Sequence, residues 1–215
     1  MKKGLTEIVF ILDKSGSMSG LEKDTIGGYN SFLKRQKEVE GEAFVSTVLF
    51  SHYSQVIHDR VPIEKIEPMT EAQYQTDGST ALLDAIGGAI HHIGNVHKYA
   101  RDEDRPEKTI IVITTDGEEN SSNKYTYPKI KKMIERQTEK YGWEFVFLGA
   151  NIDAIGEASK IGIRADRAVR YECDGVGTVL NFETMSMAVS DVRMGKAMAA
   201  NWKDDIEEHY KSKNK

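Results

Sequence analysis

The stretch TEIVFILDKSGS (residues 6–17) decides the fold of this chain. Its first part, 6–12, is almost continuously apolar, as in a strand that is buried on both faces of a sheet. Residues 13–20 are turn formers. From Leu21 to Leu33, apolar side chains recur at three- and four-residue steps, which predicts a helix. A buried strand, a polar turn and a helix in this order indicate the start of a parallel α/β sheet.

The same alternation continues along the chain. Further strands are predicted over 43–50, 55–59, 109–115, 143–148 and 167–171, and helices over 80–93, 128–141, 154–161 and 177–213. A hairpin turn at 51–54 makes 55–59 a short antiparallel edge strand. The pattern predicts a three-layer, doubly wound, Rossmann-like sheet of about six strands, mostly parallel, with helices on both faces. We expect the helix glycines Gly87 and Gly88 to allow close packing on the sheet, and 101–108 to be a solvated connection.

The chain has 215 residues, a length that suits one α/β domain. We expect a single domain over 1–215, with a core at about 5–171 and a helical extension, 172–215, packed on that core. Hydrophobic residues make up 39% of the chain, charged residues 29%, and the net charge is -5. This balance does not favour nucleic acid, which needs a basic face.

The single cysteine and the lack of a long apolar run favour a cytoplasmic protein. Cys173 is the single cysteine, so an internal disulfide cannot form and nothing indicates an oxidising compartment. The apolar run from Ile8 to Leu12 is too short for the core of a signal peptide. No run of the sequence approaches the length of a membrane span.

Polar residues of three separate segments are predicted to meet at one edge of the sheet. Asp13, Ser15 and Ser17 follow the first strand, Thr80 precedes the helix after the hairpin, and Asp116 ends a strongly β-branched strand. Ligands of such sheets bind at the carboxyl ends of the strands. Carboxylates and hydroxyls are hard oxygen donors, which suit Mg²⁺. Soft ligands are missing, which disfavours zinc and copper.

This constellation resembles the metal ion-dependent adhesion site (MIDAS) of von Willebrand factor type A domains. The resemblance covers residues 5 to 171 approximately and rests on Asp13-x-Ser15-x-Ser17, Thr80 and Asp116 in order. It implies that the three hydroxyls bind the cation directly and that the two carboxylates act largely through water. Mg²⁺ is the expected ion, with Mn²⁺ and Ca²⁺ behind it.

The same resemblance implies a protein partner that completes the metal's coordination with a Glu or Asp side chain. It is nearest to stand-alone intracellular members of bacteria and bacteriophages, some of which act beside ATPase chaperones or in stress-response complexes. A simpler interpretation is a turn in which Ser19 or Gly20 caps the first helix. That interpretation leaves Thr80 and Asp116 unexplained.

Other residues at strand ends and turns are candidates for the rim of this site. They are Met18, Glu118, Glu119, Asn151, Asp153, His52 and Tyr53, which follow strand ends or turns. A solvated loop is the favoured alternative for Glu118 and Glu119, and an exposed turn for His52 and Tyr53. For Asn151 a helix cap is the alternative. Asp77 is a candidate brace for the Thr80 loop, and Asp84 is a surface or loop-bracing residue. Neighbouring His91 and His92 point about 100° apart and lack the spacing of metal ligands.

The C-terminal segment is rich in methionine, with Met185, Met187, Met194 and Met198 among the chain's 8 methionines. Met-rich helices form adaptable binding surfaces. Several apolar residues of this segment fall on one helical face, which instead favours packing on the sheet. A dimer contact is the alternative. The residues are Val192, Ala199, Trp202, Ile206 and Tyr210.

The function that follows is a non-enzymatic, metal-dependent protein-binding module. The first alternative is a metal-dependent hydrolase or phosphotransferase. The haloacid dehalogenase type of phosphotransferase needs a second Asp where Ser15 stands, and a Lys beside Asp116. The second alternative is a structural subunit that needs no metal. The partner, the metal, the biological process and the oligomeric state stay open at the level of sequence.

Overall fold

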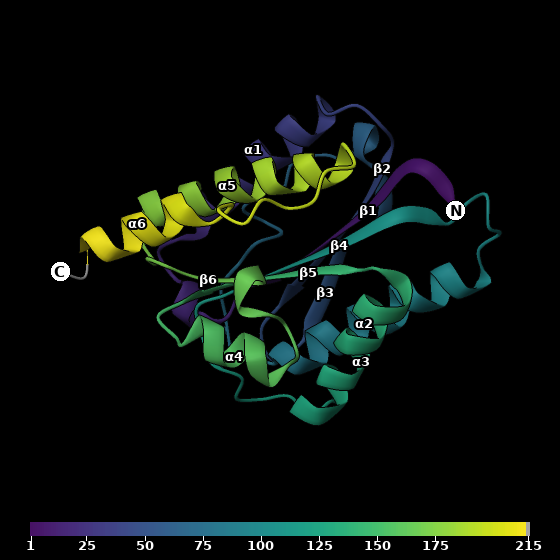
Figure 1. Cartoon of the computed structure of the whole chain (residues 1–215). Helices are drawn as coiled ribbons and strands as arrows, with labels where there is room; N and C mark the ends of the chain where they lie inside the picture. Colours follow the sequence, from purple (N-terminus) through teal and green to yellow (C-terminus); the bar gives the residue numbers. More distant parts are fainter. Residues whose placement is uncertain (214–215) are drawn as a thin grey trace.

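The computed structural model describes residues 1–213 and contains one six-stranded sheet in the order β3-β2-β1-β4-β5-β6 (Figure 1). The strands are β1 (Lys2–Asp13), β2 (Ala43–Phe50), β3 (Ser54–Pro62), β4 (Pro106–Thr115), β5 (Glu144–Ala150) and β6 (Ala168–Tyr171). The β2–β3 pair is antiparallel, and every other neighbouring pair is parallel. The predicted fold class is therefore confirmed, including the antiparallel edge strand.

The helices lie on both faces of the sheet. They are α1 (Glu22–Lys37), α2 (Leu82–Tyr99), α3 (Tyr127–Tyr141), α4 (Ala154–Lys160), α5 (Gly175–Arg193) and α6 (Asp204–Lys213). Short 3-10 turns occupy Gly16–Met18, Ile63–Lys65 and Ala165–Arg167. In Figure 1, α1, α5 and α6 cover one face, and α2, α3 and α4 cover the other. Within residues 1–213 no helix is both long and apolar enough to cross a membrane.

Strand β1 is central and is buried on both faces. Ile8, Phe10 and Leu12 belong to the hydrophobic cluster that contains residues of α1 and α5. Val9 and Ile11 alternate with them and join the cluster of α2, α3 and α4. The continuous apolar pattern of 6–12 thus reflects a strand whose two faces both contribute to the core.

The C-terminal segment is divided into two helices with a break over 194–203, where a single helical stretch was predicted. Helix α5 packs closely on α1: a Cβ atom at Gly28 would lie 2.3 Å from the ring of Phe182. The Arg193 guanidinium donates hydrogen bonds to the carbonyls of Gln36 and Gly41, fixing the end of α5 to the end of α1.

The methionines of this segment divide between packing and exposure. Met185 and Met198 are buried in the core, whereas Met187 and Met194 are each more than half exposed. Val192, Trp202 and Ile206 are buried as the packing interpretation predicts, but Ala199 is exposed. Tyr210 is half-buried, with the Arg170 guanidinium over its ring.

The segment 101–108 is not wholly the solvated connection predicted from its charges. Strand β4 begins at Pro106, and the Lys2 N–H donates a hydrogen bond to the Arg105 carbonyl. The Arg105 guanidinium in turn donates to the His97 carbonyl at the end of α2. The charges of Glu107 and Lys108 obscured this strand start. The Glu107 carboxylate accepts from the Gly4 N–H, and the Lys108 Nζ donates to the Val192 carbonyl, while the strand backbone is already paired.

The two helix glycines also differ from expectation. A Cβ at Gly87 would lie 2.5 Å from the ring of Tyr125, so this glycine admits a side chain of the loop before α3, not the sheet. Gly88 is exposed, and a Cβ there meets nothing within 4 Å. Packing therefore requires a glycine at position 87 but not at position 88.

We predict opposite effects of alanine at these two neighbouring positions. Gly87→Ala should destabilise the protein by about 1–3 kcal/mol, because the added methyl group overlaps the Tyr125 ring. Gly88→Ala should stabilise it by up to about 1 kcal/mol, since alanine favours helix over glycine. Urea denaturation of the two variants and the wild type measures both effects. Equal effects of the two substitutions would contradict this packing.

Candidate metal centre

Three loops meet at the carboxyl edge of the sheet, as the sequence predicted. Strand β1 ends at Asp13, and Asp116 follows the last residue of neighbouring β4. The loop that enters α2 carries Thr80 two residues before the helix begins, whereas the sequence placed Thr80 at its start. The Gly16 N–H donates to the Gly78 carbonyl at 3.0 Å, which ties the first loop to the second.

The hydroxyl and carboxyl oxygens of the predicted ligands form one cluster. Ser15 Oγ lies 3.1 Å from Ser17 Oγ, and Ser17 Oγ donates to Asp116 Oδ1 at 2.6 Å. A Cβ at Gly117 would lie 3.0 Å from Thr80 Oγ1 and 3.6 Å from Ser17 Oγ, so both hydroxyls flank this glycine. The structure brings these residues together; their role as metal ligands stays a prediction.

Asp13 is the most constrained member of the cluster. Its Oδ1 accepts a hydrogen bond from the Ser15 N–H at 2.7 Å, and its Oδ2 accepts one from the Thr115 hydroxyl at 2.5 Å. Burial nevertheless raises the pKa of Asp13 to about 6, because the hydrogen bonds offset only part of the lost hydration. Burial likewise raises the pKa of Asp116, against the hydrogen bond from Ser17.

These carboxylates fit a bound cation. Nearby positive charge favours the ionised form of a buried carboxyl group, and neither hydrogen-bonding hydroxyl supplies such charge. Asp13, Ser15, Thr80 and Asp116 are buried, whereas Ser17 is exposed. A cation among them would therefore be reached from the side of Ser17.

Within residues 1–213, no group of three or more His, Cys, Asp and Glu side chains is placed to hold a metal ion. A cation at this edge would depend on the serine and threonine hydroxyls. His92 instead pairs with the Asp59 carboxylate at 2.8 Å.

Several residues that support the cluster were missed in the sequence. Asn120 Oδ1 accepts from the Thr80 N–H at 2.9 Å, and the Asn120 N–H donates to the Thr80 carbonyl at 3.0 Å. The buried Tyr74 hydroxyl donates to the Asp13 carbonyl at 2.5 Å. Thr115 could have been noticed as a hydroxyl beside Asp116, but Asn120 and Tyr74 carry no local signal.

The side chain of Lys14, in the first loop, points toward the hairpin turn at 51–54. Lys14 is buried, and its Nζ donates to the Tyr53 hydroxyl at 3.0 Å and lies 3.9 Å from Asp77 Oδ1. Asp77 also accepts a hydrogen bond from the Ser51 hydroxyl, and its N–H donates to the Lys14 carbonyl. Asp77 therefore braces the loop that precedes Thr80.

Two of the candidate rim residues have structural roles within the chain. Met18 is buried, with 3% of its surface exposed, because the turn at Gly16–Met18 directs it into the core. The Glu119 carboxylate accepts hydrogen bonds from the N–H groups of Leu83 and Ser122, so it holds the start of α2. Glu119 is thus a loop brace rather than a freely solvated residue, and its contact with a partner stays a prediction.

The other rim candidates are exposed: Glu118, His52, Tyr53, Asn151 and Asp153. Asp153 accepts a hydrogen bond from the Gly156 N–H and caps α4. Their contact with a partner stays a prediction. Asp84 is a loop brace, because its carboxylate accepts from the N–H groups of 123–125.

Helix capping does not explain the polar turn after β1. Helix α1 is preceded by Leu21, which contributes no side-chain cap, and the Ser19 hydroxyl pairs with the Thr76 hydroxyl at 3.0 Å. The simpler interpretation, in which Ser19 or Gly20 caps α1, is therefore wrong.

Solved structures with the same architecture were found by structural comparison. Proximal thread matrix protein 1 of the mussel byssus, with a zinc-occupied MIDAS motif, superposes with a TM-score of 0.57 at 16% identity, over 87% of this chain and 46% of that one. A von Willebrand factor type A protein of Catenulispora acidiphila gives 0.55 at 14% identity, over 86% and 42%. The pilus adhesin SpaC of Lactobacillus rhamnosus GG gives 0.62 at 12% identity, over 89% and 30%.

These likenesses establish the fold. The chain has the α/β fold of von Willebrand factor type A domains and spans less than half the length of each of these structures. No family model matches the sequence, and no curated protein does.

The buried Asp13 charge generates a prediction for the metal-free protein. Asp13→Asn should raise the free energy of unfolding by about 3 kcal/mol at pH 7.5, because it removes an ionised group whose folded-state pKa is raised to about 6. Below pH 6 the folded wild type holds this proton, so its stability falls as the pH rises from about 4 to 6. The advantage of the variant should accordingly shrink at pH 4.5.

Urea denaturation in metal-free buffer at both pH values measures this effect. Asp102→Asn is the matched control, because the Asp102 side chain is 85% exposed and its ion pair with Arg105 adds little. An Asp13→Asn variant that is less stable than the wild type at pH 7.5 would contradict the assignment of an uncompensated buried charge.

Proposed function

We propose that this chain is a non-enzymatic protein-binding module that engages an acidic side chain of its partner through a bound divalent cation. The observation that carries the proposal is the convergence of hydroxyls and carboxylates from three loops at one edge of the sheet. Ser15, Ser17 and Thr80 would bind the cation directly. Asp13 and Asp116 would act largely through water.

The ligand set explains why the cation would bind a carboxylate. Neutral hydroxyls in direct contact leave a divalent ion short of negative charge, and hard cations take carboxylate oxygens readily. Exposed Ser17 lies on the side from which a partner would approach. A Glu or Asp of the partner would complete the coordination there.

Mg²⁺ is the proposed ion, with Mn²⁺ and Ca²⁺ as alternatives, because every donor is a hard oxygen. The absence of soft ligands disfavours zinc. The mussel protein nevertheless carries zinc in its MIDAS motif, which shows that a site of this fold accepts zinc. Zinc therefore belongs among the ions to be tested.

Binding is favoured over catalysis by the position of Lys14. Phosphoryl-transfer sites need positive charge at the transferred group. The Lys14 ammonium, which lies nearest in sequence, is instead bonded to the Tyr53 hydroxyl beside Asp77. As a working context we propose a cytoplasmic complex, and an ATPase chaperone or stress-response assembly is the first partner class to examine.

Metal binding should stabilise the folded protein by mass action. At a Mg²⁺ or Mn²⁺ concentration about 100 times Kd, stability rises by about 2.7 kcal/mol, which raises Tm by about 5 °C or more. Asp13→Ala and Thr80→Ala should each remove this rise. Thermal melts with Mg²⁺, Mn²⁺, Ca²⁺ or Zn²⁺, each against chelator, provide the measurement.

Thr138→Ala is the matched control, because Thr138 is exposed on α3, far in sequence from the three loops, and should leave the metal response intact. If wild type, Asp13→Ala and Thr80→Ala melt alike with and without metal, the proposed ligands are wrong.

Partner capture should depend on the cation. The immobilised protein should retain a host protein from lysate in Mg²⁺ and release it in chelator, and Thr80→Ala should retain none. Quantitative mass spectrometry of the eluted fractions distinguishes these cases. A partner that stays bound in chelator would contradict a metal-mediated contact.

A further inference from the structure

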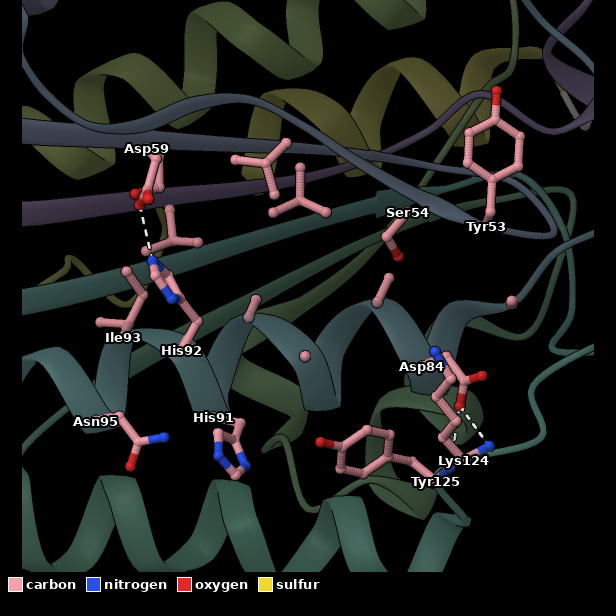
Figure 2. A pocket seen from close by; sticks show the side chains of 18 of the residues that line it. Tyr53, Ser54, Asp59, Asp84, His91, His92, Ile93, Asn95, Lys124 and Tyr125 are labelled. Carbon is pink, nitrogen blue, oxygen red and sulfur yellow. Dashed lines mark hydrogen bonds and ion pairs between the residues drawn. The ribbon is translucent and has the colours of Figure 1, made fainter.

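A groove of about 830 Å³ lies between α2 and the β2–β3 edge of the sheet (Figure 2). In the figure, α2 crosses the view below the strands. Tyr53 and Ser54 stand toward one end of the groove, and Asp59 meets His92 at the other. The volume is in the range of ligand-binding sites.

The groove exists because α2 leaves the edge strand uncovered. Helix α2 packs against β1 and β2, and it presents small residues to the gap, namely Ala85, Gly88 and Ala89. Val56 of β3 is consequently 57% exposed, beside Val48 of β2. Apolar side chains thus line the groove between polar groups, with Tyr53 and Ser54 toward one end and Asp59 and His92 at the other (Figure 2).

The same loops build the groove and the metal centre. Ala81 lines the groove and directly follows Thr80. His52 also lines it, and a Cβ at Gly78 would lie 2.2 Å from His52 Nδ1, so this ring packs on the loop that precedes Thr80. The loop that starts at Asp116 reaches the groove at 123–125. A ligand bound at the oxygen cluster can therefore extend along these shared loops into the groove.

The described part of the chain itself does not supply an occupant. Helices α5 and α6 lie against the opposite face of the sheet (Figure 1). At the other end of the chain, the backbone of Lys2 is bonded to Arg105, so the first residues pair within the sheet.

The groove has the length of a short extended peptide. From Ser54 to Asp59, β3 advances about 17 Å at roughly 3.4 Å per residue. An extended segment of about five residues covers this distance. Alternate side chains of such a segment point to one side, so two or three of them would face the apolar middle.

We infer that this groove binds the partner segment adjacent to the metal-bound acidic residue, an extended stretch of about five residues whose alternate side chains are aliphatic. The inference rests on the proposed function and adds to it the chemistry of the partner. The acidic side chain contacts the cation, and Leu, Ile or Val side chains cover Val48 and Val56. The cation selects for charge, and the groove selects for apolar spacing.

Selection from phage-displayed random nonapeptides, against the protein in Mg²⁺, tests this inference. The enriched peptides should carry one Asp or Glu followed or preceded by aliphatic residues at alternate positions, and chelator should release them. Replacing one of these aliphatic residues by Ser in a synthetic enriched peptide should weaken binding by about tenfold, the usual result for one buried side chain.

The variant Gly88→Leu places a large side chain in the groove, at a position where a Cβ meets nothing within 4 Å. It should lower the affinity of the enriched peptide at least tenfold and leave the Mg²⁺-dependent rise in Tm unchanged. Gly27→Leu is the matched control. Gly27 lies within α1 on the opposite face, and a Cβ there also meets nothing within 4 Å.

Three outcomes would overturn the inference. The first is that no acidic, aliphatic-patterned peptides are enriched. The second is that metal-dependent peptides bind Gly88→Leu as tightly as the wild type. The third is that groove-dependent peptides stay bound in chelator, which separates the groove from the metal centre. The metal melts decide the proposed function independently, because they need no peptide.

Discussion

The buried carboxylate of Asp13, at the end of the central strand, is the group on which the rest of the site depends. The strand carries it into the interior, where an ionised group is costly unless it is compensated. The Ser15 N–H and the Thr115 hydroxyl provide part of that compensation, and the Tyr74 hydroxyl holds the Asp13 backbone. Its pKa still stays near 6. In the proposed function, a cation supplies the remaining positive charge.

Much of this arrangement was predictable from local sequence. A strand that is buried on both faces shows a continuous apolar run, and 6–12 and 109–115 show it clearly. Parallel strands end at the same edge, so the polar residues after those runs had to approach one another. The hairpin at 51–54 identified the antiparallel edge. Fold and oxygen cluster therefore follow from patterns that a few consecutive residues carry.

The rest depends on contacts between segments distant in sequence. Asn120 brackets Thr80 and Glu119 holds the start of α2, yet both stand in an ordinary polar loop. Glu7 lies in the apolar run of β1, where it is fully buried and pairs with Arg60 at 2.9 Å. No local pattern predicts which partner a loop carboxylate or a strand carboxylate will find. The same limit explains why Gly87 was assigned to the sheet and not to Tyr125.

A cation alone is a weak basis for specificity, because any exposed carboxylate can complete its coordination. Discrimination among partners must come from surfaces that the partner touches next to the metal. The groove between α2 and β3 adjoins the Thr80 loop, and its apolar middle offers what the cation lacks. Because both are built on the loops at 51–54, 78–81 and 116–125, partner selection and metal binding would share one rigid support. In that arrangement the acidic side chain of the partner fixes its position at the cation, and the spacing of its aliphatic side chains determines which partners bind tightly.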